Sequence, residues 1–221
     1  MPYHLFLVPV ILVLIVFYKV YRDRNDLKKI AVIQPLITCL SIVLCLLSFL
    51  TPGYRLGYTF LVLLGLILSV VADFVLVDVK DMKKLIQALV LFLLIYIAYS
   101  LALTLESRFL VGDLFSAVGL LLVIVLSMAW LWKGLKGLKI PVLAYVMLLC
   151  FFINRAISTF SSPDFAVVQS ILVTAASSMF LIGDLELAFS TFKKPIPLYI
   201  GPVTYALSQM LMALSACYFP K

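Results

Sequence analysis

Two aspartates lie inside apolar segments that are long enough to cross a lipid bilayer. Asp73 stands in the run GLILSVVADFVLV, and Asp184 stands in the run SSMFLIGDLELAF. A charged side chain near the bilayer centre costs about 2.5–3.5 kcal/mol, so such residues usually face a polar interior and mark function. A protonated carboxyl beside a carboxylate suits acid/base chemistry on substrates that form an oxocarbenium ion. The sequence therefore predicts carboxylate catalysis at Asp73 and Asp184.

Residues for other hydrolytic chemistries are few and scattered. His4 is the only histidine, and no serine stands in a G-x-S-x-G motif, which disfavours a Ser-His-Asp hydrolase. The cysteines show no ligand spacing, so a zinc site would have almost no ligands. They are Cys39, Cys45, Cys150 and Cys217. We therefore expect no metal and no cofactor.

The composition is that of an integral membrane protein. Of the 221 residues, 65% are hydrophobic and 12% are charged, against about 45–50% and about 25% in soluble domains. The net charge of +7 would also suit nucleic-acid binding, but the basic residues cluster in short loops between apolar segments. We expect one all-α transmembrane domain over residues 1–221, with membrane lipids rather than nucleic acid as its partners.

Eight segments approach the length of about 20 apolar residues that a membrane-spanning helix needs. They are Tyr3–Tyr18, Ile30–Leu50, Leu56–Val79, Leu85–Leu105, Leu110–Trp132, Ile140–Phe160, Phe165–Phe192 and Pro197–Tyr218. Basic residues follow the first segment rather than precede it, and no cleavage site is evident, so we expect a retained helix instead of a signal peptide. The sequence thus predicts about eight transmembrane helices in one bundle.

The distribution of basic residues predicts the orientation of the bundle. In the eight-helix arrangement, thirteen of the 17 basic residues fall in loops on one side, and the exceptions are Arg55, Arg108, Arg155 and Lys221. The positive-inside rule makes the richer side cytoplasmic and puts both termini on the other side. Asp73 and Asp184 then lie about 10 and about 13 Å above the cytoplasmic ends of their helices. A bacterial inner membrane and a eukaryotic endomembrane both fit, and the oligomeric state stays open.

Helical spacing groups further polar residues with the aspartates. Ser69 precedes Asp73 by four residues and Ser177 precedes Asp184 by seven, so each pair shares a helix face. We expect a polar chamber, open to the cytoplasmic leaflet, that collects the candidate substrate-binding residues. These are Gln34, Ser69, Tyr96, Tyr99, Ser177, Tyr205 and Gln209. Glu186 is expected to point away from Asp184 and either to snorkel or to pair with a lysine or arginine near the interface, and Asn154 and Arg155 are expected to snorkel.

The order of these motifs resembles the YhhN family of membrane lysoplasmalogenases. The family pattern contains Lys-Pro, S-x-x-G-D, H-x-x-Y, F-x-x-S-D and Y-x-x-x-Q in successive helices. The matching positions here are Gln34-Pro35, Ser69 to Asp73, Tyr96 to Tyr99, Phe180 to Asp184, and Tyr205 to Gln209. This chain departs from the pattern where Gln34 replaces lysine, Tyr96 replaces histidine, and Gly183 replaces serine.

The resemblance implies hydrolysis of the vinyl-ether bond of a lysoplasmalogen, a single-chain ether phospholipid. The products would be a fatty aldehyde and a glycerophospho-base. One aspartate would protonate the vinyl β-carbon, while the other would stabilise the oxocarbenium ion and deprotonate the attacking water. The sequence does not indicate which aspartate is the acid and which is the base.

Two other classes of function stay open. Intramembrane carboxylates also serve proton relays and ion sites, so a transporter fits, although glycines and prolines fall mostly near the segment ends. The replacements at Gln34 and Tyr96 also leave room for a non-catalytic lipid-binding protein. That alternative would be favoured if Asp73 and Asp184 lay on opposite outer faces of the bundle.

Overall fold

The computed structural model describes residues 4–76, 82–194, 196, 198 and 200–220, and these residues form eight α-helices and no strand. The helices are α1 His4–Asp23, α2 Leu27–Leu46, α3 Leu56–Leu76, α4 Met82–Glu106, α5 Gly112–Leu131, α6 Lys139–Ser158, α7 Val167–Phe192 and α8 Gly201–Ser215. Short 3-10 turns extend α2 (Leu47–Leu50), precede α6 (Lys136–Leu138) and follow it (Thr159–Ser161). The predicted all-α architecture is confirmed.

Seven of the described helices, α1 to α7, are long and apolar enough to cross a membrane. The last predicted segment is shorter than expected: α8 has 15 residues and ends at Ser215, and its expected start at Pro197 lies outside the described residues. At 1.5 Å per residue it covers about 22 Å of the roughly 30 Å hydrocarbon core. α8 packs against α1, α2, α3 and α7, so it is surrounded by other helices rather than by lipid.

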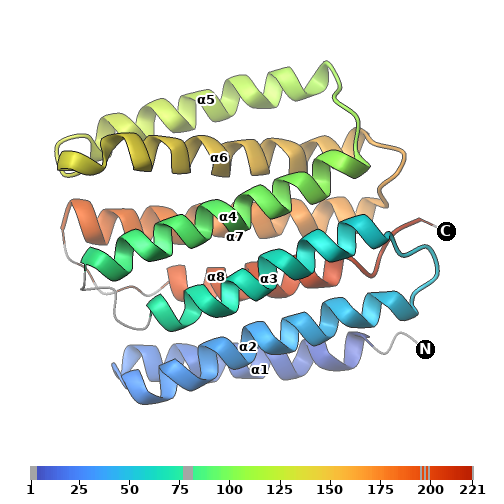
Figure 1. Cartoon of the computed structure of the whole chain (residues 1–221), viewed down its shortest axis with the longest axis horizontal. Helices are drawn as coiled ribbons and strands as arrows, with labels where there is room; N and C mark the ends of the chain where they lie inside the picture. The colour runs from blue at the N-terminus through green and yellow to red at the C-terminus, as the bar shows by residue number, and fades with distance from the viewer. Residues whose placement is uncertain (1–3, 77–81, 195, 197, 199, 221) are drawn as a thin grey trace.

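The helices lie side by side in one bundle (Figure 1). α5 and α6 form one edge, α1 and α2 form the opposite edge, and α3, α4, α7 and α8 lie between them. α1 begins at the same end of the bundle at which α8 finishes, as an even number of crossings requires. Large apolar side chains such as Phe60, Leu121 and Val16 are exposed on the outside, which is the surface that lipid tails cover.

The closest approach of α3 to α4 depends on a glycine. A Cβ atom built at Gly65 would overlap the ring of Tyr99, so only a hydrogen at this position leaves room for the tyrosine. Tyr99 is fully buried there, and its hydroxyl reaches Gln209 on α8 at 2.7 Å. Gly65 therefore positions one of the polar side chains that the sequence assigned to the chamber.

Substitution of Gly65 tests this packing. We expect Gly65→Ala to lower the unfolding temperature, with a loss of about 1–3 kcal/mol, because a methyl group overpacks the Tyr99 site. Gly119→Ala is the matched control: Gly119 lies in α5, no atom lies within 4 Å of its added Cβ, and alanine favours the helix by about 1 kcal/mol. Thermal unfolding of the two purified variants in detergent tests whether Gly65→Ala lowers the unfolding temperature while Gly119→Ala does not. A Gly65→Ala variant as stable as wild type would contradict the packing.

Candidate active site

Asp73 of α3 is fully buried, and both of its oxygens are occupied by donors from α2. The Gln34 side-chain amide donates to Oδ1 at 2.9 Å, and the Thr38 hydroxyl donates to Oδ2 at 2.5 Å. Gln34 and Thr38 are four residues apart, so one face of α2 presents both donors. The Tyr18 hydroxyl of α1 donates in turn to Gln34 Oε1 at 2.8 Å. Asp73 is thus the end of a satisfied network that ties three helices together.

Asp184 of α7 has a different environment. The hydroxyls of Tyr96 on α4 and Tyr145 on α6 both donate to its Oδ2 atom, at 2.6 and 2.7 Å. Its Oδ1 atom receives no hydrogen bond from any described residue, and the side chain is only partly buried. Asp184 therefore keeps one oxygen available for a ligand.

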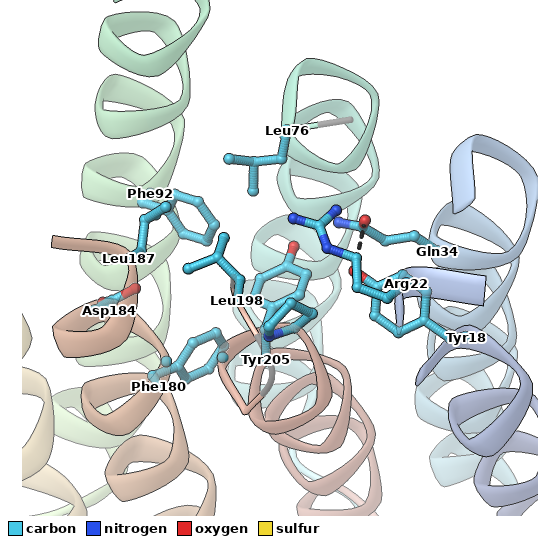
Figure 2. Close-up of a pocket in the computed structure, with 13 residues that line it drawn as sticks. Tyr18, Arg22, Gln34, Leu76, Phe92, Phe180, Asp184, Leu187, Leu198 and Tyr205 are labelled. Carbon is cyan, nitrogen blue, oxygen red and sulfur yellow. Dashed lines mark hydrogen bonds between the residues drawn. The ribbon is translucent and has the colours of Figure 1, made fainter. Parts of the chain in front are cut away.

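A cavity of about 510 Å³, open mouth included, is lined in part by Asp184. Side chains from α1, α2, α3, α4, α7 and α8 surround it (Figure 2). Asp184 lies on one side of the cavity, while Gln34 and Tyr205 lie across from it. Asp73 is not among the described residues that line the cavity; its partner Gln34 is. Of the two aspartates, only Asp184 is presented to the space.

The structure divides the candidate substrate-binding residues into three groups. Gln34 and Tyr205 line the cavity, and Tyr96, which does not line it, donates a hydrogen bond to Asp184, which does. A second group forms a chain outside the lining: Tyr99 donates to Gln209, which donates to Ser69 Oγ at 2.8 Å. Ser177 joins neither group, because its hydroxyl donates to the Thr174 carbonyl within α7. Both aspartates face the inside of the bundle, which is not the outward arrangement that would favour a non-catalytic protein.

Four polar residues around the site were not predicted from the sequence. Thr38 follows Gln34 by four residues, a spacing that could have identified it. Tyr145 belongs to no motif, and no spacing in the sequence relates it to the other polar residues; its hydroxyl donates to Asp184. Tyr18 and Arg22 lie near the end of α1. The sequence alone predicts Arg22 to be one of the basic residues of a cytoplasmic loop.

Arg22 is the one cation among the described residues that line the cavity. Figure 2 shows its guanidinium reaching from α1 in beside Gln34 and below Leu76. Neither Asp73 nor Asp184 forms an ion pair with a lysine or arginine of the described chain, and Arg22 itself forms none there. The same residues contain no group of three His, Cys, Asp or Glu side chains that could hold a metal ion.

Glu186 fixes the start of α8 next to the cavity. Its carboxylate accepts hydrogen bonds from the backbone amides of Ile200 and Gly201, so it caps the helix instead of snorkelling as expected. A carboxylate at a helix N-terminus satisfies free amides and complements the helix dipole. The close contact between Gly183 and Gly201, where an added Cβ would meet backbone at 3.1 Å, brings α7 and α8 together at this point.

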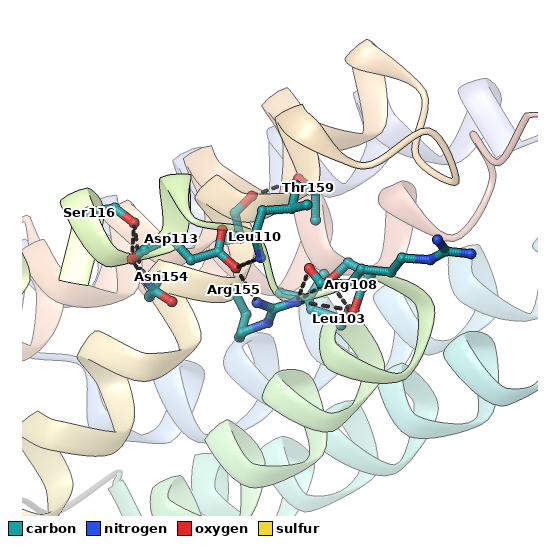
Figure 3. Close-up of polar contacts among 10 residues, drawn as sticks. Leu103, Arg108, Leu110, Asp113, Ser116, Asn154, Arg155 and Thr159 are labelled. Carbon is teal, nitrogen blue, oxygen red and sulfur yellow. Dashed lines mark hydrogen bonds and ion pairs between the residues drawn. The ribbon is translucent and has the colours of Figure 1, made fainter.

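A second polar cluster, at the opposite end of the bundle, is structural (Figure 3). Arg155 is fully buried, pairs with Asp113 at 2.9 Å, and donates to the hydroxyl and carbonyl of Ser107 and to the carbonyl of Arg108. Asn154 donates to the Asp113 carbonyl at 2.8 Å. The expectation that Asn154 and Arg155 snorkel is therefore wrong: together they bind the α4–α5 connection to α6.

Comparison with known proteins gives one match. The model of the YhhN family matches residues 33–216, which span α2 to α8. No curated protein and no solved structure matches the chain. Tyr18 and Arg22 precede the matched range. Gln34 and Tyr96, two of the three replacements noted in the sequence, are among the residues that donate to Asp73 and Asp184, respectively.

Cysteine accessibility tests the different exposure of the two aspartates. In a Cys39→Ala background, which removes the exposed native thiol, we expect Asp184→Cys to react with a small water-soluble methanethiosulfonate at least about tenfold faster than Asp73→Cys. The three buried native cysteines serve as the internal baseline. Equal reaction rates in two variants with unchanged unfolding temperatures would contradict the greater exposure of Asp184.

Proposed function

The chain belongs to the YhhN family, and from this premise we propose that it is a membrane hydrolase that cleaves the vinyl-ether bond of lysoplasmalogens. The observation that carries the proposal is the carboxyl of Asp184: it lines a cavity, one of its oxygens accepts hydrogen bonds from two tyrosines, and the other accepts none from the described residues. A carboxyl in this geometry can hold a proton on Oδ1 while Oδ2 accepts both hydroxyl hydrogens. It is therefore arranged to act as a general acid.

The first step transfers this proton to carbon. The Oδ1 proton of Asp184 adds to the vinyl β-carbon, the C=C π electrons form the new C–H bond, and the α-carbon becomes an oxocarbenium ion. The carboxylate left on Asp184 lies against the new cation and stabilises it in a site largely shielded from water. Tyr96 and Tyr145 keep this carboxylate in place throughout because they bind its other oxygen.

The second step uses the same carboxylate as a base, as in reactions where one carboxyl acts first as acid and then as base. Water adds through its oxygen to the α-carbon and gives one proton to Asp184, which restores the acid. The resulting hemiacetal loses the glycerol oxygen as an alcohol, its hydroxyl proton passes to that oxygen, and the fatty aldehyde is released. One water is consumed for each bond cleaved.

Asp73 has a positioning role in this proposal. Its oxygens are occupied by Gln34 and Thr38, so it does not contact the substrate, but it orients Gln34 at the cavity wall. Its negative charge also favours a cation developing in the cavity. Of the two aspartates that the sequence singled out, Asp184 is thus assigned the proton transfers.

Arg22 provides the contact for the head group. A lysoplasmalogen carries one phosphate, and an arginine guanidinium binds phosphate through paired hydrogen bonds. Because α1 ends at the basic, predicted cytoplasmic side, the phosphate would remain near the membrane surface while the vinyl-ether bond reaches Asp184.

Replacement of each aspartate is expected to have a different effect on hydrolysis. Asp184→Asn should lower kcat by about 10²–10⁴, the usual contribution of a general acid or base. Asp73→Asn should lower kcat less and should also lower the unfolding temperature, because the NH₂ group that replaces one oxygen would face the donor of either Gln34 or Thr38. The assay is aldehyde release from lysoplasmalogen by the purified protein.

An ester-linked lysophospholipid of the same chain length is the control substrate for this assay. Release of fatty acid from the ester, rather than aldehyde from the vinyl ether, would refute the proposed chemistry. Equal activity of wild type and Asp184→Asn would refute the assignment of Asp184.

Substitution of Arg22 tests the head-group contact. Arg22→Gln should raise KM for a lysoplasmalogen by at least about tenfold with little change in kcat, since hydrogen bonds to charged groups contribute about 1.5–3 kcal/mol. KM for an alkenylglycerol, which has no phosphate, should stay the same. Arg24→Gln is the matched control because Arg24 is exposed and does not line the cavity. An equal rise in KM for both substrates would exclude phosphate binding by Arg22.

A further inference from the structure

A second pocket reaches Asp184 from the other side of α7. It lies between α4, α5, α6 and α7 and encloses about 720 Å³, its opening included. Thirteen of its 17 described lining residues are apolar, among them Leu131, Val146 and Phe192. Asp184, Phe92 and Leu187 line both this pocket and the cavity that contains Arg22. Asp184 therefore lies where a cavity that contains a cation, Arg22, meets a pocket that is almost entirely apolar.

A single-chain lipid with a polar head has the same division of polarity. We infer that the apolar pocket between α4 and α7 binds the hydrocarbon chain of the lipid, so that the bond next to the head group lies at Asp184. This inference rests on the proposed function for the identity of that bond. The cavity around Arg22 takes the polar end, and Phe92 and Leu187 flank the point at which the chain passes from one space to the other.

The pocket controls selectivity more than affinity. A lipid chain that moves from the bilayer into an apolar pocket leaves one hydrocarbon environment for another, so burial alone provides little driving force. What the pocket can discriminate is length and shape, because close-packed walls do not adjust freely to extra methylene groups. Chain-length preference should therefore depend on the side chains that fill the pocket.

Val146 and Leu131 are the positions at which to change the pocket. Both are buried in one apolar cluster with Met128 and Val142, on α6 and α5. Val146→Phe narrows the pocket, and Leu131→Ala widens it. The matched control is Met147→Phe: Met147 follows Val146 in the chain but is 55% exposed against 9%, and it does not line the pocket.

The experiment measures binding without cleavage. Purified protein in detergent is offered an equimolar mixture of dodecyl and octadecyl alkyl-ether lysophosphocholines, which lack the vinyl bond, and the bound lipids are counted by native mass spectrometry. Val146→Phe should raise the dodecyl-to-octadecyl ratio at least about tenfold, within the range by which a pocket rejects extra methylene groups. Leu131→Ala should lower the ratio, and Met147→Phe should leave it at the wild-type value.

The outcomes separate this inference from the proposed function. Unchanged ratios in both pocket variants, or an equal change in Met147→Phe, would overturn the chain site even if wild type hydrolyses lysoplasmalogen. Opposite shifts in the two pocket variants would support the chain site even if wild type releases no aldehyde. If Val146→Phe does not fold, the ratio for Leu131→Ala decides the question on its own.

Discussion

The need to satisfy two carboxyl groups inside an apolar bundle shapes the arrangement of this protein. Lipid tails offer no hydrogen bonds, so each carboxyl takes hydrogen bonds from side chains on neighbouring helices. Asp73 accepts hydrogen bonds from α2, and Tyr18 of α1 in turn binds the donor Gln34. Asp184 accepts hydrogen bonds from α4 and α6. Leaving such a group unsatisfied costs about 1–3 kcal/mol. The helix contacts that satisfy the two carboxyls therefore also stabilise the bundle.

The two aspartates differ because their surroundings differ. Asp73 has no free oxygen and no exposed surface. Asp184 keeps one oxygen without a hydrogen bond from the described residues, and it lines both the cavity that contains Arg22 and the apolar pocket. Two chemically identical groups can thus hold different roles, one in proton transfer and one in positioning. Gln34 and Tyr96, two of the three replacements relative to the YhhN pattern, are both neutral donors to these aspartates, so each supplies a hydrogen bond without adding a charge.

The sequence was sufficient for the helices and for the aspartates, because both depend on local information. Apolar runs fix where helices lie, and position along a predicted helix fixes the depth of a residue, which is how Gln34 and Tyr205 were assigned to the chamber. Contacts between helices depend on their rotation and separation, which a single helix does not encode. For this reason the partnership of Tyr145 with Asp184, the capping by Glu186 and the burial of Arg155 appeared only in the structure.

Hydrolysis of a lysoplasmalogen in D₂O tests the central claim most directly. If a proton passes to the vinyl β-carbon, the wild-type protein must release fatty aldehyde that carries a single deuterium at the carbon next to the carbonyl, once the product is reduced immediately to prevent exchange. Asp184→Asn should release almost none. Aldehyde without deuterium at that carbon, or labelled aldehyde at the wild-type rate from Asp184→Asn, would contradict proton transfer by Asp184.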